Sequence, residues 1–322
     1  MASTAAAPPQ VPLRRGRRVL SLFAWAALVP VAVLLVVRVL GLDGGSVLAL
    51  PVAGFPLVAA GTTVLAALFG ILRLRAGWVA LGLVLVQAVV LLPRFVADGA
   101  DVPSAAPRIR VATVNALKGR VDPSALMEVV RRERVDVLAV QELPEAGVRA
   151  LREAGLEAEL PHVEPHPEVD TSLYSRLPLR EGGLLDAPTT WPQTTAKVEV
   201  AGRSLTLVGV HTYYPAGNPG RWGQDMAALR SVAGRDVVVL GDFNATLDHS
   251  AMRELLAAGL ADAHDELGIG WAPTWPADGV LPPLVQLDHV LHGSGLAPVS
   301  ARTEQLPRTD HRMVVAELAL LP

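Results

Sequence analysis

The sequence predicts an α/β domain over residues 108–322, preceded by three apolar segments. The chain has 322 residues and is 51% hydrophobic, with a mean hydropathy of +0.38, and this excess lies before residue 98. From residue 108 onward, apolar runs of strand length alternate with amphipathic stretches of helical period. Most of the strand runs are continuous and not alternating, which is typical of sheets covered on both faces. The domain is therefore expected to be α/β.

The three apolar segments are nearly free of charge, and each has about the 20 residues that cross a bilayer. They are residues 19–37, 47–72 and 77–97, and together they predict a transmembrane region over 19–97. A cleaved signal peptide is the alternative for the first segment, but that segment is long and no A-x-A site follows it. Burial of all three as core helices of a soluble protein is a further alternative.

The distribution of arginine predicts the orientation of these segments. The basic N-terminus, residues 1–18, contains Arg14, Arg15, Arg17 and Arg18, and the link between the second and third segments contains Arg73 and Arg75. The link at 38–46 contains only Arg38. This pattern predicts a cytoplasmic N-terminus, and three crossings then leave the domain outside the cytoplasmic membrane. The absence of cysteine agrees with an exported domain and equally with a cytosolic one.

A short tether rich in Pro, Ala and Gly, residues 98–107, connects the apolar region to the domain. Within the domain, Asp122 and Pro123 predict the start of an amphipathic helix, as N-cap and first helical residue. Strands are predicted at 108–116, 136–143, 171–179, 195–202, 204–214, 236–244, 284–293 and 313–320, and helices at 122–135, 219–232 and 250–258.

The charge of the domain argues against a stable complex with nucleic acid. Residues 103–322 contain 20 Lys and Arg against 28 Asp and Glu, a net charge of −8. Proteins that hold nucleic acid through its phosphates present a basic face, because neutralising phosphates supplies most of the non-specific affinity.

Polar residues follow the apolar strand runs at the point where each run ends. In α/β folds such residues collect at one edge of a sheet, where ligands bind. The residues are Asn115, Glu142, His211, Asp242, Asn244, Asp288, Asp310 and His311. Carboxylates dominate this set, so the predicted cofactor is a hard ion, Mg²⁺, with Mn²⁺ as the alternative.

In combination, the motifs GDFN, LDH and TDH, after an upstream Asn and QE, resemble the endonuclease/exonuclease/phosphatase superfamily of DNase I-like proteins. The resemblance covers nearly all of residues 108–320. It implies a four-layer sandwich of two mixed β-sheets flanked by helices, and hydrolysis of phosphoric esters with a divalent metal ion.

The resemblance also implies roles for individual residues. Glu142 would be the main metal ligand, with Asn115 and Asp310 in support. Asp242 would orient or deprotonate the attacking water. Asn244, His211 and Asn115 would contact the phosphate, and His311, paired with Asp288, would stabilise charge in the transition state. These roles agree with the needs of phosphoryl transfer, which are a positioned water, a metal ion and donors for the equatorial oxygens.

For several other polar and aromatic residues, the sequence leaves more than one role open. Tyr213 and Trp275 are expected at the mouth of the site, as are Tyr214 and Trp222, although packing roles are equally compatible. The stretch DTSLYSR, residues 170–176, keeps Ser175 and Arg176 of a strand motif in the family but lacks its glycine. That departure bears on the choice of substrate.

Six other histidines and one aspartate are expected to have no catalytic role. His289 would face away from Asp288 as a structural residue. Three are expected on the surface: His249, His264 and His292. His162 and His166 would lie in a solvated loop. Asp248 and His249 would simply begin the helix at 250–258.

The apolar segments narrow the range of expected substrates. An outward-facing domain tethered to the membrane meets lipid head groups at high effective concentration. The architecture also resembles the VanJ-like membrane proteins of actinobacteria, which are linked to teicoplanin resistance. This resemblance implies hydrolysis of a lipid-linked phosphate of the polyprenyl diphosphate type. A membrane-tethered Mg²⁺-dependent nuclease and a non-catalytic binding domain are the alternatives.

Overall fold

The computed structural model describes residues 13–166 and 170–322. The chain divides into two compact units. The helical unit comprises residues up to 36 together with 55–90, and the sheet unit comprises 37–54 together with 91–322. Of the predicted basic N-terminus, residues 1–12 lie outside the described part of the chain.

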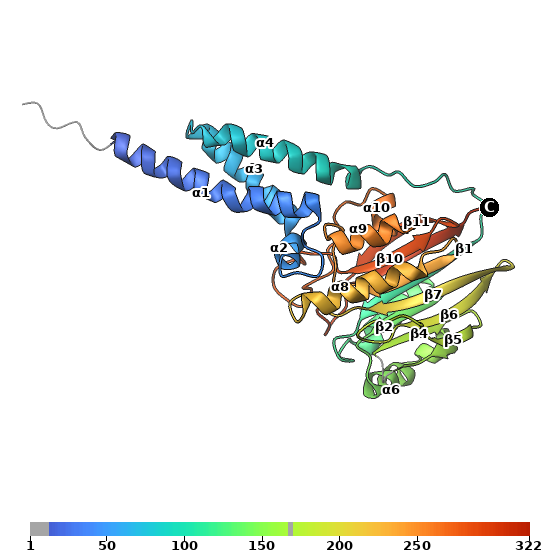
Figure 1. The fold of residues 1–322 in the computed structure, drawn as a ribbon. Helices are drawn as coiled ribbons and strands as arrows, with labels where there is room; N and C mark the ends of the chain where they lie inside the picture. The colour runs from blue at the N-terminus through green and yellow to red at the C-terminus, as the bar shows by residue number, and fades with distance from the viewer. Residues whose placement is uncertain (1–12, 167–169) are drawn as a thin grey trace, which may run out of the picture. The chain divides into compact units, whose positions relative to one another are not determined.

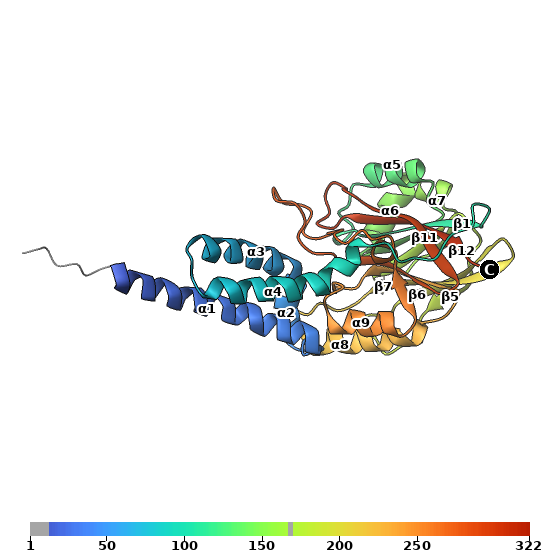
Figure 2. The ribbon, with the colours of Figure 1, turned by 90° about the horizontal axis from the view of Figure 1, so that it is seen from above.

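The helical unit consists of three apolar helices that lie side by side (Figures 1 and 2). They are α1 (Leu13–Leu40), α3 (Phe55–Ile71) and α4 (Ala76–Leu91). Small and apolar side chains fill the contact between them: Ala24, Leu28, Phe69, Leu74, Ala76 and Ala80. Small residues allow helix backbones to approach closely, as at helix contacts in membranes.

In the part of the chain that the structure describes, two helices are long and apolar enough to cross a membrane, Gly16–Leu40 with 25 residues and Ala76–Phe95 with 20. The second range includes the short η1 (Leu92–Phe95). The single span predicted at 47–72 is instead two helices, α2 (Ala49–Ala53) and the 17-residue α3. Pro56 has no backbone N–H and cannot donate to the carbonyl oxygen four residues before it, and the helix breaks at Gly54. At about 1.5 Å per residue, α3 reaches roughly 25 Å, short of a bilayer core. Three crossings are therefore not confirmed.

The sheet unit contains two six-stranded mixed sheets. In the first the order is β11 (Leu296–Glu304), β12 (Met313–Leu320), β1 (Arg108–Asn115), β2 (Val137–Gln141), β4 (Thr171–Ser175), β3 (His162–Glu164). In the second it is β5 (Arg180–Leu184), β6 (Thr194–Val200), β7 (Arg203–His211), β8 (Val237–Asp242), β10 (Asp288–Gly293), β9 (Leu260–Asp262). The pairs β1/β2 and β7/β8 are parallel, and the others are antiparallel.

The two sheets pack face to face, and helices cover their outer faces (Figure 1). One apolar core lies between the sheets and includes Val111, Ala139, Leu207 and Leu240. On the first sheet lie α5 (Pro123–Glu133), α6 (Glu145–Glu153) and α7 (Leu156–Glu159), and on the second α8 (Pro219–Ala228), η2 (Leu229–Val232) and α9 (Ser250–Ala257). The short α10 (Ala263–Glu266) follows β9. This arrangement confirms the predicted α/β class and its order of four layers.

The predicted helices and strands agree with the structure where the sequence pattern is strong. Asp122 accepts hydrogen bonds from the Ser124 and Ala125 N–H groups and caps α5, as predicted. The strand predicted from 284 begins only at Asp288. Four strands were not predicted, namely β3, β5, β9 and β11, and these are the four edge strands of the two sheets. Edge strands are short or partly polar because one side of each lacks a neighbour, so they have no continuous apolar run.

One end of the sandwich collects the predicted polar residues. The parallel pairs β1/β2 and β7/β8 end there, with Asn115, His211 and Asp242 as last residues of their strands. The antiparallel β10 begins there at Asp288, and its pairing sets this residue opposite Asp242.

Candidate active site

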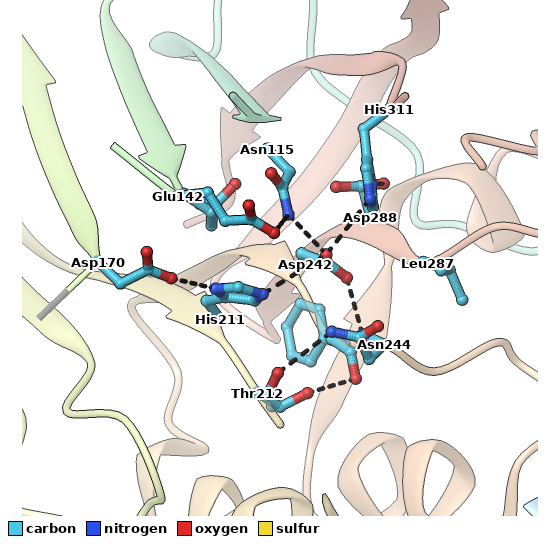
Figure 3. A network of polar contacts seen from close by, with 12 residues as sticks. Asn115, Glu142, Asp170, His211, Thr212, Asp242, Asn244, Leu287, Asp288 and His311 are labelled. Atoms are coloured by element: carbon cyan, nitrogen blue, oxygen red, sulfur yellow. Dashed lines mark hydrogen bonds and ion pairs between the residues drawn. The ribbon is translucent and has the colours of Figure 1, made fainter. Parts of the chain in front are cut away.

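Seven of the eight predicted strand-end residues line one cavity of about 740 Å³. They are Asn115, Glu142, His211, Asp242, Asn244, Asp310 and His311. The eighth, Asp288, is fully buried and lies behind His311 (Figure 3). The structure therefore brings together the whole set of polar side chains that the sequence places at strand ends.

The motif GDFN fixes Asp242 and Asn244 at the end of a completely buried strand, β8. A Cβ atom at Gly241 would lie 1.9 Å from the Val210 carbonyl oxygen, so only glycine fits between the strands. Asn244 has a φ of 46°, in the left-handed region. Its N–H donates to Asp242 Oδ1 at 2.9 Å. Left-handed backbone at a non-glycine residue costs free energy and is typical of functional sites.

Two imidazoles point at the Asp242 carboxylate from opposite sides (Figure 3). His211 Nδ1 is hydrogen-bonded to Asp170, and His311 Nδ1 lies 2.8 Å from Asp288 Oδ2. The Nε2 atoms lie 3.8 Å (His211) and 3.7 Å (His311) from Asp242 Oδ2. Each carboxylate thus accepts a hydrogen bond from one ring nitrogen and directs the other nitrogen toward Asp242.

Asn115 connects the ends of the two sheets. Its amide group donates to Glu142 Oε1 and to Asp242 Oδ2, both at 3.1 Å. Its amide oxygen accepts the Leu117 N–H at 2.9 Å. The other Glu142 oxygen accepts the Lys118 N–H at 3.0 Å. Asn115 was predicted as a supporting metal ligand, but in this arrangement it presents hydrogen-bond donors, and not its oxygen, to the carboxylates.

Burial and charge set the protonation of the centre. Burial raises the pKa of Asp242, and the Asp288 carboxylate adds to the rise while the imidazoles oppose it. Burial would lower the pKa of His311, but the carboxylates of Asp288 and Asp242 outweigh it and raise the pKa to about 10. Burial opposes a rise at His211 as well, yet its hydrogen bond to Asp170 and the charge of Asp242 raise its pKa. His311 is therefore cationic at neutral pH, and the surroundings of His211 favour its cationic form.

The donor atoms of the cavity fit a hard divalent ion. Asp242, Asp288 and His311 offer ligand atoms that all lie within 4.8 Å of one another. Glu142 and Asp310 add carboxylates to the lining. Among the described residues, the buried Oδ1 atoms of Asp288 and Asp310 have no hydrogen-bond partner. Carboxylate oxygens are the ligands that Mg²⁺ and Mn²⁺ prefer.

The aromatic residues expected at the mouth separate into two groups. Trp275 lines the cavity and donates its indole N–H to Asp310 Oδ2 at 3.1 Å. Tyr214 also lines it, whereas Tyr213 does not and instead stacks on Tyr214 with ring centroids 4.8 Å apart. Trp222 is fully buried in the core beneath α8. Tyr213, predicted to contact the substrate, is therefore not a lining residue, whereas its neighbour Tyr214 is.

Several lining residues escaped sequence reasoning. Asp170, which orients His211, lies directly before the start of β4 and not after the end of a strand. Lys118 and Trp191 lie in connecting segments with no periodic signal. Leu50 and Ala53 come from α2, inside the stretch predicted to cross the membrane.

Three histidines expected on the surface are buried: His249, His264 and His292. This prediction was wrong because distant segments cover them. His249 Nε2, for example, lies 3.0 Å from the Ala49 carbonyl oxygen, 200 residues away in the chain. His289 is buried as well, and its Nδ1 lies 2.7 Å from Asp262, outside the cavity.

The remaining polar residues singled out by sequence lie away from the cavity lining. Ser175 is buried in β4, and Arg176 lies 3.6 Å from Asp136. His166 lies 3.0 Å from Glu164 in its loop, and His162 is the first residue of β3. Residues 167–169 of that loop are outside the described part of the chain.

Residues 112–311 match the endonuclease/exonuclease/phosphatase family, and the chain belongs to this family. The matched range contains every residue of the cavity centre described above. Members of this family are generally metal-dependent phosphoesterases and nucleases.

Solved structures share the fold at low sequence identity. Zebrafish (D. rerio) TDP2, humanized by 14 mutations, is 20% identical with a TM-score of 0.54, covering 66% of this chain and 98% of that one. SmcL is 13% identical with a TM-score of 0.52, covering 66% and 99%. A family protein from Beutenbergia cavernae DSM 12333 is 17% identical with a TM-score of 0.50, covering 67% and 72%. These likenesses concern the fold alone. None of the curated proteins compared with the chain matches it.

Proposed function

We propose that the protein is a divalent-metal-dependent phosphohydrolase that acts at the outer face of the cytoplasmic membrane on a lipid-linked phosphate ester. A substrate of the polyprenyl diphosphate type fits this proposal, in line with the resemblance to VanJ-like proteins and their link to glycopeptide resistance. The observation that carries it is the convergence of two Asp–His pairs on the Asp242 carboxylate, inside a cavity that also contains Glu142 and Asn244.

This arrangement suits in-line attack of water on phosphorus. Asp242 accepts the proton of the attacking water, and its raised pKa makes it a stronger base than an ordinary aspartate. Asn244 uses one amide hydrogen on the Thr212 carbonyl oxygen at 3.2 Å. Its second amide hydrogen donates to a phosphate oxygen. The two imidazolium groups stabilise the negative charge that builds on the equatorial oxygens.

Glu142 and Asp310 are the residues that would hold the divalent ion, because Asp288 and His311 already pair with each other at 2.8 Å. A bound ion would supply Lewis acidity at a phosphate oxygen. Asn115 keeps the Glu142 and Asp242 carboxylates in place through its two N–H donors. Because these groups are held by the sheets, little reorganisation is needed during reaction.

The apolar helices support a site of action at the membrane. Gly16–Leu40 and Ala76–Phe95 have the length and composition of membrane spans. With the Arg-rich N-terminus inside the cell and the shorter α3 as a third crossing, the domain would face outward, where it meets lipid head groups at high effective concentration. No stable nucleic-acid complex is expected, because the domain carries a net charge of −8 over residues 103–322.

Phosphate release from a polyprenyl diphosphate tests the proposal. The full-length protein in vesicles with Mg²⁺ should release phosphate, and Glu142→Ala and His311→Ala should each reduce the rate at least about a hundredfold. An exposed carboxylate in the same domain supplies a control, since Asp186→Asn should retain the wild-type rate. Equal rates in wild type, Glu142→Ala and His311→Ala would refute the proposal.

A membrane-tethered nuclease is the second candidate, favoured by one observation. The zebrafish TDP2 fold is also known in a complex with single-strand DNA product, with 19% identity and a TM-score of 0.53 to this chain. Degradation of plasmid DNA by the full-length protein in Mg²⁺, abolished by Asp242→Asn, would favour the nuclease. Failure to turn over even bis-p-nitrophenyl phosphate would instead favour a non-catalytic binding domain.

A further inference from the structure

The segment that joins α1 to α3 is built into the sheet unit. This segment, residues 41–54, is called the link segment below. The Ser250 N–H donates to Asp43 Oδ2 at 2.9 Å, and both residues are buried. His249 Nδ1 accepts the Thr246 N–H at 2.8 Å, so its Nε2 carries the hydrogen and donates to the Ala49 carbonyl oxygen at 3.0 Å. The start of α9 therefore holds the link segment at two points.

A buried ion cluster fixes the same region. Asp248 is fully buried and accepts from Arg94 at 2.9 and 3.0 Å and from Arg38 at 3.1 Å. Arg253 donates to the Arg38 carbonyl oxygen at 2.8 Å and to that of Asp248. The last turn of α1 and the residues after α4 are thus tied to one carboxylate of the domain.

The backbone of the link segment also packs closely on α8. A Cβ atom at Gly223 would lie 2.8 Å from Gly45 Cα and 3.0 Å from its nitrogen, so glycine is required where the two backbones meet. Ala49 and Val52 are fully buried, and Ala49 belongs to the same core cluster as Trp222. Figure 1 shows α2 close to α8 and α9. The link segment is therefore a wall of the domain.

This wall presents apolar side chains to the catalytic cavity. Leu50 and Ala53 line the cavity that contains Asp242. Leu50 remains 48% exposed although its neighbours Ala49 and Val52 are fully buried. Further apolar lining comes from Trp275, Val285 and Leu287. The cavity of about 740 Å³ is within the range of small-molecule sites and exceeds what a phosphate group fills.

We propose that Leu50 and Ala53 form a subsite for the hydrocarbon chain of the substrate and select phosphoesters that carry a long apolar chain. The inference rests on the proposed function and names a specificity determinant of that site. One cavity contains both the polar centre and this apolar wall, so a single amphiphilic molecule can occupy both. Ala53 is also only two residues before α3, which is an apolar helix.

Two diphosphates with the same reacting group test this subsite. The full-length protein in neutral phospholipid vesicles is given a polyprenyl diphosphate or the short, water-soluble dimethylallyl diphosphate, and the ratio of the two kcat/KM values is measured. Leu50→Asn should lower the long-to-short ratio about tenfold, and Leu50→Ala about threefold, because apolar contact area is lost only for the long chain.

Leu48 provides the matched control. It lies in the same segment with 38% exposure but does not line the cavity, so Leu48→Asn should keep the wild-type ratio. A wild-type ratio in Leu50→Asn and Leu50→Ala, or an equal fall in Leu48→Asn, would overturn the subsite while leaving the proposed function standing. A wild-type protein that releases phosphate from neither diphosphate would contradict the proposed function, and the subsite with it.

Discussion

Asp242 and Asp248 lie six residues apart in the stretch GDFNATLDH, and both are buried, yet their surroundings differ. Asp242 accepts hydrogen bonds from Asn244 and Asn115 and faces an open cavity, with two imidazole nitrogens at 3.7 and 3.8 Å. Asp248 is enclosed by two arginines at hydrogen-bond distance.

Burial of a carboxylate therefore does not by itself indicate a catalytic role. A carboxylate whose neighbours leave room for water and phosphate is available for proton transfer. A carboxylate that is enclosed by guanidinium groups instead holds segments of the chain together. Removing either charge would leave the other buried without a partner. The same short stretch thus provides the base of the proposed reaction and the carboxylate that holds Arg38, just before the link segment, and Arg94.

A large effect in the catalytic region is expected from Asp288→Asn, of the same order as those of Glu142→Ala and His311→Ala. The substitution keeps the shape of the side chain but removes the charge that raises the pKa of His311. Hydrolysis should fall about a hundredfold, as for a charge that orients a catalytic histidine, while the melting temperature stays within a few degrees. Steady-state kinetics and thermal unfolding of the same sample measure both. An unchanged rate would show that Asp288 does not act through His311.

At the buried ion cluster, Asp248→Asn should lower the free energy of unfolding by about 3 kcal/mol, because Arg38 and Arg94 lose their buried counter-charge. Thermal unfolding of the full-length protein in detergent gives the change. The exposed pair Arg230–Glu254 provides the control, and Glu254→Gln should cost less than about 1 kcal/mol. Equal costs would mean that the cluster at Asp248 is no stronger than a surface ion pair.

A smaller effect is expected from Gly223→Ala on α8. Alanine favours helix over glycine by about 1 kcal/mol, but its Cβ would meet the Gly45 backbone at 2.8 Å, so the protein should be destabilised by about 1–2 kcal/mol. Gly82→Ala in α4 meets no atom within 4 Å and should be neutral or stabilising. Stabilisation by Gly223→Ala in thermal unfolding would argue against tight packing of the link segment.

The smallest effect concerns a third carboxylate, Asp265, which is proposed neither as a base nor as a residue that holds segments together. Burial raises its pKa to about 6, and its Oδ1 has no hydrogen-bond partner among the described residues. Because the folded pKa lies above the unfolded value of 3.8, the folded state binds the proton more tightly, and stability falls as pH rises from about 4 to 6. Asp265→Asn should therefore raise the stability by about 1 kcal/mol at pH 7.5, after allowance for solvent screening, and by nothing at pH 4. Melting curves at the two pH values measure this, and an equal gain at both would contradict the assignment.

The sequence was sufficient for the central strands and for the cavity centre, because both depend on local patterns. A continuous apolar run marks a buried strand, and the first polar residue after it marks the end of the sheet. Edge strands such as β11 have no such run and were not predicted. Asp170 precedes its strand, and a rule that considered strand starts as well as strand ends would have found it.

The attachment of the link segment could not be predicted from local patterns. Asp248 meets Arg38, 210 residues away in the chain, and His249 meets Ala49, 200 residues away. Taken alone, the stretch around Asp248 and His249 has the composition of a surface turn. The stretches around Arg38 and Ala49 have the composition of membrane segments. Their burial depends on pairing between distant segments, which no periodicity along the chain reports.

The most direct test of the account is the Mg²⁺-dependent hydrolysis of bis-p-nitrophenyl phosphate by full-length Asp242→Asn and Asp248→Asn, measured together at a temperature where both are folded. If Asp242 is the base and Asp248 only holds segments of the chain together, the rate should be at least about a thousandfold below wild type for Asp242→Asn. It should be within about fivefold of wild type for Asp248→Asn. Wild-type activity in Asp242→Asn would contradict the account.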